Sequence, residues 1–493
     1  MERLGGGKEP VETTTLKELV TDLETTALTG ADVVVTGIAY RADRVRQGDV
    51  FCCVPGFAFD GHDFAAEAVG KGAVALVTNR LLDVKVPQAV VSDVRTALAL
   101  GAARLHGHPS HDLDVVGITG TNGKTTTAYL VDSVLRAAGR VTGLIGTVET
   151  RVAGRRLDSA RTTPESADLQ ELLARMRDDG VGAVSMEVSS HAIDLKRVAG
   201  VRFAVAAFTN LTQDHLDYHH TIEEYWSVKR RLFTEADVGA RVVNIDDPYG
   251  LELARETGAE WTVGRHPDAR VRATDERHGP DSSAFVLRAP SGDVAVTLPL
   301  AGAYNVSNAL VAAGCGLALG IDPGTVVTGL EAAPQVPGRL ERIDAGQTFT
   351  VFVDYAHTPD SLAKALGAVR AVTPGRVIVV FGCGGDRDPD KRSLMGCAAG
   401  EGADEIVLTS DNPRGEDPVG IILQIEDGLR GSDTSYAVEV DRRAGIARAV
   451  GLAVPGDSVL IAGKGHEDYQ IFADRTVHFD DREVAREELM KLC

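Results

Sequence analysis

The feature that most constrains this chain is a glycine-rich turn between a strand-like and a helix-like segment. The turn covers residues 117–126 and contains Lys124 followed by two threonines. It follows the apolar run 114–118 and precedes a run, 126–138, with apolar residues on one stripe. In this layout backbone N–H groups and a helix N-terminus surround anionic phosphate oxygens. We therefore predict a phosphate-binding loop, in which Lys124 reaches the outer phosphates and the Thr125 hydroxyl contacts Mg²⁺.

Length and composition limit the class of protein. At 493 residues the chain is too long to pack around a single hydrophobic core, so we expect about three domains. An apolar content of 44% is typical of globular packing. The net charge of −20 and the aromatic content of 5% argue against nucleic acid and anionic membranes as partners. No apolar run approaches the length of a membrane span, so we expect a soluble cytoplasmic protein. We also expect a monomer whose partners are small molecules.

The cysteine pattern favours free thiols over disulfides. No pair has CxxC spacing, and the adjacent Cys52 and Cys53 are poorly suited to a mutual bond. We therefore predict buried, reduced thiols. The six cysteines are Cys52, Cys53, Cys315, Cys383, Cys397 and Cys493.

Alternating strand-like and helix-like segments predict three α/β domains, at 1–110, 111–336 and 337–493. The first is small, begins with a frayed polar start at 1–12 and ends in a polar linker at 106–109, whose histidines have metal-like spacing. The second is a P-loop ATPase-type parallel sheet, and the third is a doubly wound, Rossmann-like sheet with ligands at the carboxyl ends of its strands. Predicted strands include 33–35, 49–54, 73–78, 89–91, 183–188, 203–209, 349–353, 377–381, 405–409 and 459–462. Predicted helices include 64–71, 166–178, 222–233 and 306–318.

Acidic, histidine and lysine residues follow the central strands. Glu187 ends an apolar strand, where a lone carboxylate is costly unless paired, and it is well placed to hold Mg²⁺. The segment 210–220 is rich in Asp and His, which is consistent with either a solvated loop or a metal shell. Lys229 lies one helix later beside two arginines, and the residues alone favour a surface lysine.

Several weaker signals lie near helix starts and a hinge. Asn305 and Asn308 begin a helix, where asparagine is usually a cap. Arg339 belongs to a Pro-Gly-Arg segment typical of an interdomain hinge. Asp354 and His357 follow a strand, where they could face a nucleotide.

Three charged, glycine-containing clusters follow strands of the third domain, at 382–388, 411–414 and 463–467. Arginine offers a planar fork that suits a carboxylate better than lysine does. Each cluster alone is consistent with ordinary turn chemistry. Together they predict a site for one zwitterionic ligand at the carboxyl edge of the sheet.

With these residues assembled, the chain resembles the Mur ligases, ATP-dependent amide-forming enzymes of peptidoglycan precursor synthesis. The resemblance covers nearly the whole chain and rests on 120–126, 186–191, 215–219, Lys229 before Leu232-Phe233, 305–308, 337–339 and 354–357. Asp-Asn-Pro-Arg at 411–414 matches the motif by which some members recognise meso-diaminopimelate, and lysine-adding members lack that arginine. The chain departs from the family at Arg41-Ala42-Asp43, where Asp-Ser-Arg is usual, and at Leu195, where some members have glutamine.

The resemblance implies a role for each matching residue. ATP would contact Gly120, Thr121, Asn122, Gly123, Lys124, Thr125, Thr126, Asn305, Asn308, Arg339, Asp354 and His357. The UDP-linked substrate would contact Thr162, Thr163, Ser189 and Arg197, and diaminopimelate would contact Arg387, Asp411, Asn412, Pro413, Arg414, Gly463 and Glu467. Mg²⁺ would be held by Thr125, Glu187, His215 and Lys229, the last as a CO₂-derived carbamate. The catalytic set would be Lys124, Glu187, His215, Lys229 and Arg339.

The implied reaction adds meso-2,6-diaminopimelate to the D-glutamate of UDP-N-acetylmuramoyl-L-alanyl-D-glutamate through an acyl phosphate. Two alternatives stay open. The same ligase chemistry could use another amino acid such as L-lysine. The chain could instead be a nucleotide-binding regulator without catalysis, which the four matching residues Lys124, Glu187, His215 and Lys229 argue against.

Overall fold

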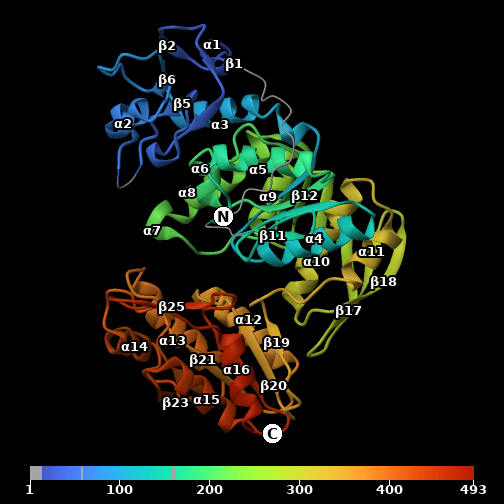
Figure 1. Cartoon of the computed structure of the whole chain (residues 1–493). Coiled ribbons are helices and arrows are strands. Elements are labelled where there is room, and N and C mark those ends of the chain that lie inside the picture. The colour runs from blue at the N-terminus through green and yellow to red at the C-terminus, as the bar shows by residue number, and fades with distance from the viewer. Residues whose placement is uncertain (1–13, 57–58, 158–160, 493) are drawn as a thin grey trace. The chain divides into compact units, whose positions relative to one another are not determined.

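The computed structural model describes residues 14–56, 59–157 and 161–492 (Figure 1). The chain forms two compact units, each assembled from segments that are discontinuous in sequence. The first comprises Met1–Thr119, Gly139–Ala207 and Ser227–Arg241, and the second comprises Gly120–Ala138, Phe208–Trp226 and Val242–Cys493. The predicted polar start at 1–12 and Cys493 lie outside the described residues. None of the described helices has the length and the apolar character that crossing a bilayer requires.

A five-stranded sheet forms the N-terminal part of the first unit. Its strand order is β2-β7-β6-β5-β4, parallel from β4 to β7 and antiparallel at β2. Buried aliphatic side chains of α1 and α3 pack on it, as the predicted α/β pattern requires. The elements are α1 (Leu16–Leu19), β2 (Thr25–Leu28), β4 (Gly37–Ala39), β5 (Asp49–Cys52), α2 (Ala65–Gly70), β6 (Ala75–Thr78), β7 (Gln88–Val91) and α3 (Val94–Leu105).

The segment after α3 packs against the first unit, so the prediction of a polar linker at 106–109 is wrong. Arg177 Nη1 donates a hydrogen bond to the His106 carbonyl at 3.0 Å. Pro109 is buried, and Ser110 Oγ accepts a hydrogen bond from the Arg202 backbone at 3.0 Å. The sequence suggested a linker because its side chains are polar, whereas much of the packing uses backbone groups and a proline ring.

The other strands of the first unit lie in a second, mainly parallel part of its structure. Their order is β11-β10-β9-β12-β8-β13, with β9, β12 and β8 parallel and β10 and β11 antiparallel. β12 is fully buried and β8 is buried from Val115 onward, as expected of parallel strands covered on both faces. The elements are β8 (Asp114–Thr119), β9 (Thr142–Ile145), β10 (Thr150–Val152), β11 (Arg155–Leu157), α5 (Ser166–Asp178), β12 (Ala183–Glu187) and β13 (Arg202–Phe208).

The central strands of the second unit include an antiparallel part that the sequence did not predict. β14 (Asp237–Asn244) begins in the first unit, and its last residues pair in parallel with β15 (Trp261–Gly264). β16 (Val271–His278), β17 (Ser283–Ala289) and β18 (Gly292–Leu298) are antiparallel, and their residues alternate in burial. Such alternation belongs to a sheet with one solvated face, and it lacks the continuous apolar run that marks a parallel strand. The helices here include α4 (Lys124–Ala137), α9 (Pro248–Thr257), α10 (Ala303–Ala318) and α11 (Pro323–Glu331).

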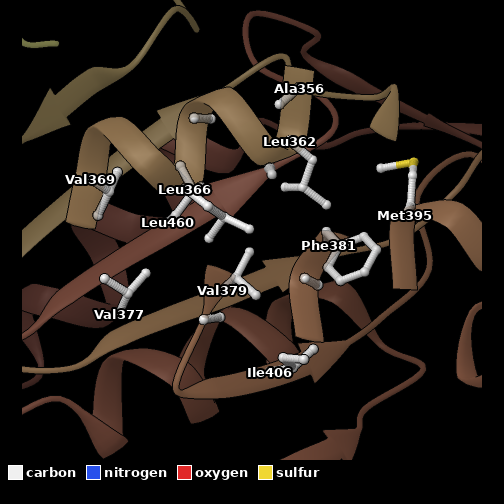
Figure 2. Packing of buried hydrophobic residues seen from close by; sticks show 14 of the residues in the cluster. Ala356, Leu362, Leu366, Val369, Val377, Val379, Phe381, Met395, Ile406 and Leu460 are labelled. Atoms are coloured by element: carbon white, nitrogen blue, oxygen red, sulfur yellow. The ribbon is translucent and has the colours of Figure 1, made fainter. Parts of the chain in front are cut away.

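The C-terminal part of the second unit is a doubly wound sheet. Its order is β19-β20-β24-β21-β22-β23, and only the edge strand β19 is antiparallel. On one face Leu362 and Leu366 of α12 point toward Val379 and Phe381 (Figure 2). Helices α15 and α16 cover the other face. The elements are β19 (Glu341–Ile343), β20 (Thr350–Asp354), α12 (Pro359–Ala371), β21 (Val377–Phe381), α13 (Asp390–Gly402), β22 (Glu405–Leu408), α14 (Pro418–Asp427), β23 (Ser435–Val438), α15 (Arg442–Leu452), β24 (Ser458–Ala462), β25 (Tyr469–Ile471), β26 (Thr476–His478) and α16 (Asp481–Met490).

The described cysteines are free thiols, as predicted. Cys52, Cys53, Cys315 and Cys383 are buried, whereas Cys397 is exposed, contrary to the prediction that all are buried. Burial raises the pKa of the Cys53 thiol to about 12, which keeps it protonated at neutral pH.

Candidate active site

The predicted phosphate loop joins β8 to α4, whose first residue is Lys124. Gly120 and Gly123 have φ angles of +146° and +85°, which glycine adopts without strain. A Cβ on Gly120 would lie 1.9 Å from Thr209 Oγ1, and one on Gly123 would lie 2.2 Å from Asn308 Oδ1. The close packing of this loop therefore requires glycine at both positions.

Lys124 lies directly on the loop. Its Nζ donates hydrogen bonds to the carbonyls of Gly120 at 3.0 Å and Thr121 at 2.8 Å. The ammonium is thus held at the N-terminus of α4, where the helix dipole also favours an anion. This arrangement suits an anionic phosphate group.

Asn305 and Asn308 support the loop from the side of α10. The N-cap of α10 is Gly302, so the interpretation of Asn305 as a cap is wrong. Asn305 Nδ2 donates to the Ala301 carbonyl at 2.8 Å, and Asn308 Nδ2 donates to Asn305 Oδ1 at 3.1 Å. Both amides are buried, and Asn305 fixes the orientation of Asn308, which lies beside Gly123.

Arg339, predicted at an interdomain hinge, and the residues at the end of β20 lie in the same unit as Lys124 and Thr125. Arg339 Nη2 donates to Thr125 Oγ1 at 3.2 Å, and its guanidinium lies 4.4 Å from the ring centroid of Tyr355. Asp354 accepts backbone hydrogen bonds from Leu340 and Ala356 at 2.6 and 2.8 Å, and burial raises the pKa of its carboxyl. Burial lowers the pKa of His357, so its imidazole is neutral at neutral pH.

Glu187 ends β12, opposite Ile118 in the register with β8, and is 1% exposed. Its carboxylate accepts hydrogen bonds from the Thr147 backbone at 2.8 Å and from the Thr147 hydroxyl at 3.2 Å. Thr162 Oγ1 lies 3.0 Å from Thr147 Oγ1, and Thr163 Oγ1 donates to the Glu187 carbonyl at 2.8 Å. The predicted Thr162 and Thr163 are therefore gathered at this strand end. Sequence reasoning missed Thr147, whose only signal is its place just after β9.

A cluster of three arginines lies around one carboxylate in the first unit. Arg197 Nε lies 2.8 Å from Glu165, Arg161 lies 3.3 Å from it, and Arg95 lies 3.5 Å from it. Burial lowers the pKa of Arg197, which remains a cation at neutral pH. Arg197 also donates to the Thr163 carbonyl at 3.3 Å. The excess positive charge suits an anionic substrate, and of these residues only Arg197 and Thr163 were predicted.

Lys229 is 1% exposed on α8 (Ile222–Thr234), so the interpretation as a surface lysine is wrong. The helix periodicity did not show which face is buried. His215 has a left-handed φ of +55° just before α7 (Leu216–His219), and its ring lies 3.5 Å from the Asp214 carboxylate. Within the described ranges, no group of three or more His, Cys, Asp or Glu residues is placed to hold a metal ion.

The three charged clusters of the C-terminal sheet lie together, as predicted. Gly385 N donates to the Asn412 carbonyl at 2.9 Å, and Arg414 Nη1 donates to the Gly385 carbonyl at 2.8 Å. Asn412 Nδ2 donates to Glu467 Oε2 at 2.9 Å. A Cβ on Gly463 would lie 2.7 Å from Asp411 Oδ2. Arg387, from the first cluster, is exposed.

Two buried arginines, neither predicted, anchor these clusters. Arg442 pairs with Asp481 through two 2.7 Å hydrogen bonds, and both side chains are 0% exposed. Arg442 also donates to the carbonyls of Ser410 at 3.3 Å and Ala462 at 3.0 Å, the residues just before Asp411 and Gly463. The pair therefore fixes two of the three strand ends.

The second anchor is Arg392, which is 1% exposed and forms two 2.8 Å hydrogen bonds with Glu416. It also donates to the Gly384 carbonyl at 3.2 Å. Glu416 in turn accepts a hydrogen bond from the Asp386 backbone. This network joins the loop after β21 to the loop after β22.

Replacing Glu416 by glutamine is expected to change how stability depends on acid pH. The hydrogen bond from Arg392 lowers the pKa of Glu416 from 4.5 to about 2. The stabilisation by the carboxylate is thus complete above about pH 4.5 and is lost as the pH falls towards 2. The difference in urea midpoint between wild type and Glu416→Gln should therefore shrink between pH 7 and pH 3. An unchanged difference would contradict the assignment.

Consecutive parts of the chain match known protein families. The description "Mur ligase family, catalytic domain" matches residues 34–113, "Mur ligase middle domain" matches 118–316, and "Mur ligase, glutamate ligase domain" matches 338–465. A protein from Streptomyces coelicolor named UDP-N-acetylmuramoyl-L-alanyl-D-glutamate–2,6-diaminopimelate ligase is 46% identical over 98% of this chain and 97% of its own length. The chain belongs to the Mur ligase family.

Other Mur ligases are similar over comparable lengths. A protein of the same name from Geobacillus thermodenitrificans is 47% identical over 93% of this chain and 95% of its own length. A solved structure with that ligase name is 30% identical, with a TM-score of 0.70 over 97% of this chain and 99% of that chain. MurF ligase from Thermotoga maritima, solved with ADP, shares the fold with a TM-score of 0.61 at 19% identity, over 93% of this chain and 97% of its own. As a Mur ligase the chain is an ATP-dependent ligase, and the predicted α/β fold class is confirmed.

Proposed function

We propose that this Mur ligase uses ATP to join meso-2,6-diaminopimelate to the D-glutamate of UDP-N-acetylmuramoyl-L-alanyl-D-glutamate, in cytoplasmic peptidoglycan precursor synthesis. The observation that carries the proposal is the loop 411–414, whose Arg414 lies beside Gly385 while Asn412 contacts Glu467. A guanidinium suits the additional carboxylate of diaminopimelate, which L-lysine lacks. The names of the relatives at 46% and 47% identity support the same substrate.

In this proposal the chain supplies the contacts to ATP from the phosphate loop and the segments that pack on it. Lys124 and Arg339 bind and neutralise the transferring phosphoryl group, and Asn305, Asn308, Asp354 and His357 complete the nucleotide site. The remaining loop contacts are Gly120, Thr121, Asn122, Gly123, Thr125 and Thr126.

The donors proposed for Mg²⁺ are Thr125, Glu187, His215 and Lys229. The Thr125 hydroxyl and the Glu187 carboxylate are oxygen donors of the type that Mg²⁺ prefers, and a carbamate on Lys229 would add another. Bound Mg²⁺ would neutralise charge on the phosphates. Lys229 would serve as a carbamate, formed when its neutral amine attacks CO₂, makes an N–C bond and releases one proton. Carbamate formation would change the charge of this side chain, which is 1% exposed, from positive to negative.

The first-unit residues are proposed to hold the UDP-linked substrate. Arg197, in a cluster with excess positive charge, suits a carboxylate of the substrate, and Thr162, Thr163 and Ser189 lie at or near the same strand end. The γ-carboxylate of the substrate attacks the γ-phosphorus of ATP, which gives an acyl phosphate and ADP. The amine of diaminopimelate then attacks the acyl carbon, loses a proton and displaces phosphate. The protein contributes mainly positioning and charge stabilisation.

We propose domains at 1–110, 111–336 and 337–493, for the UDP substrate, ATP and the amino acid respectively. The family matches at 34–113, 118–316 and 338–465 support this division. We also propose that the protein acts as a monomer.

Phosphate release by the purified protein with ATP, Mg²⁺ and the UDP-linked dipeptide tests the proposed function. We expect release that depends on meso-diaminopimelate and is weak with L-lysine, and we expect Arg414→Ala to reduce that preference. Phosphate release with L-lysine but not with meso-diaminopimelate would show that L-lysine is the amine substrate. Release with neither amine would favour the regulatory alternative.

A further inference from the structure

A fully buried lysine lies at the predicted diaminopimelate site, and the assignment of ligand contacts gives it no role. Lys464 follows β24 and is 0% exposed. Its Nζ lies 3.2 Å from Asn412 Oδ1 and 3.3 Å from Glu467 Oε2, and it lies 5.4 Å from the ring centroid of Tyr469. Because the ammonium has no solvent access, direct contact with a ligand is not its role. A desolvated cation of this kind is stable only when it is paired and hydrogen-bonded.

The contacts of Lys464 fix the orientation of the Asn412 amide. Asn412 Oδ1 accepts hydrogen bonds from Lys464 Nζ and from the Ile471 backbone at 3.0 Å. With its oxygen occupied by these two donors, the amide directs Nδ2 to Glu467 Oε2 at 2.9 Å. The amide of Asn412 therefore has one orientation that satisfies all its partners.

The same contacts divide the two oxygens of Glu467. Oε2 accepts hydrogen bonds from both Lys464 and Asn412, whereas Oε1 accepts none from any residue that the structure describes. The Glu467 side chain is 17% exposed, so it can reach a ligand. A carboxylate held at one oxygen presents the other in a fixed direction to a cationic donor, with which it would form a charge-assisted hydrogen bond.

We propose that Lys464 is a positioning residue for diaminopimelate. It holds Glu467 Oε2 and orients Asn412, so that Glu467 Oε1 receives an ammonium group of the substrate. An amine held as its ammonium does not attack, and Glu467 therefore binds the amino group at the end that does not react. Arg414 would hold a carboxylate of the substrate. The inference rests on the proposed function, because it requires an amino acid at this site.

A double-mutant cycle tests the inference. With ATP and the UDP-linked dipeptide saturating, Lys464→Met is expected to raise the KM for diaminopimelate about 10- to 100-fold, the cost of losing a hydrogen bond to a charged group. The KM for ATP should stay within about twofold. If Lys464 acts through Glu467, adding Lys464→Met to Glu467→Gln should raise KM by less than about 3-fold.

Lys491→Met is the matched control. Lys491 pairs with Glu488 at the same i,i+3 spacing in the same sheet domain, but its side chain is 64% exposed. We expect it to leave the KM for diaminopimelate unchanged.

Three results would overturn the inference: an unchanged KM for diaminopimelate in Lys464→Met, an equal rise in the KM for ATP, or additivity with Glu467→Gln. If Lys464→Met does not fold, the double variant, which buries no unpaired charge, is compared with Glu467→Gln alone, and a further 10-fold rise rejects the proposal. A wild type that uses L-lysine but not diaminopimelate would instead reject the proposed amine. The two failures are therefore distinguishable.

Discussion

Replacing Arg442 by methionine is expected to lower the free energy of unfolding by about 3–5 kcal/mol, the usual cost of leaving one member of a buried ion pair without its partner. Both Arg442 and Asp481 are 0% exposed, so no water can replace the lost contacts. The carbonyls of Ser410 and Ala462 would also lose a donor. Urea-induced unfolding measures the loss. The KM for diaminopimelate should also rise, because both carbonyls belong to strand ends that carry the proposed diaminopimelate site.

Arg443 provides a control on the same two helices. It pairs with Glu487 at 2.6 Å between α15 and α16, but the two side chains are 45% and 50% exposed. Arg443→Met is therefore expected to cost less than about 1 kcal/mol. Arg442→Met combined with Asp481→Leu should recover most of the stability, because no buried charge then remains. If Arg442→Met and Arg443→Met lowered the free energy of unfolding equally, burial of the ion pair would not explain the effect.

Lys229→Ala is expected to reduce kcat about 10²- to 10³-fold, a typical effect of removing one preorganised electrostatic group at a reacting centre. The physical reason is the proposed carbamate, which places an anion where the unmodified side chain places a cation. Wild-type protein given ¹³C-labelled bicarbonate should show a carbamate signal by NMR, and Lys229→Ala should lack it. Near-normal turnover in the variant would remove Lys229 from the catalytic set.

Lys71 is a suitable control for that experiment, because it is a surface lysine whose side chain is 44% exposed. Lys71→Ala should retain both turnover and the carbamate signal. Since Lys229 is 1% exposed, its removal could also destabilise the fold, so the urea midpoint is measured for each variant. A loss of the signal at an unchanged midpoint would separate the chemical role from a packing role.

The sequence predicted the parts of the site whose functional residues are contiguous in the chain. The phosphate loop occupies ten consecutive positions, 117–126, and the strand and helix that flank it were located within two residues of their observed ends. The clusters at 411–414 and 463–467 were placed together because parallel strands meet at one edge of their sheet. The ligand roles of these residues stay predictions.

Features that depend on partners distant in sequence were not predicted. Arg442 and Asp481 are 39 positions apart, and nothing in either local pattern marks a buried pair. The burial of Lys229 and Lys464 was missed because a polar residue type argues for exposure until its partners are known. Asn305 was interpreted as a possible cap because its residue type is common there, whereas the helix begins two residues earlier at Ala303.

The discontinuity of the second unit has a consequence for synthesis on the ribosome. Helix α4, which begins at the phosphate loop, donates a hydrogen bond from Ser133 to the carbonyl of Gly329 in α11, 196 positions later in the chain. At about 5–20 residues per second, the ribosome adds Gly329 roughly 10–40 seconds after it adds Ser133. Until then the apolar face of α4 lacks its partner α11, and it lacks α10 until residue 318 has been added. The nascent chain therefore keeps part of this face exposed while 196 further residues are made, and α11 can pack on α4 only after about two thirds of the chain exists.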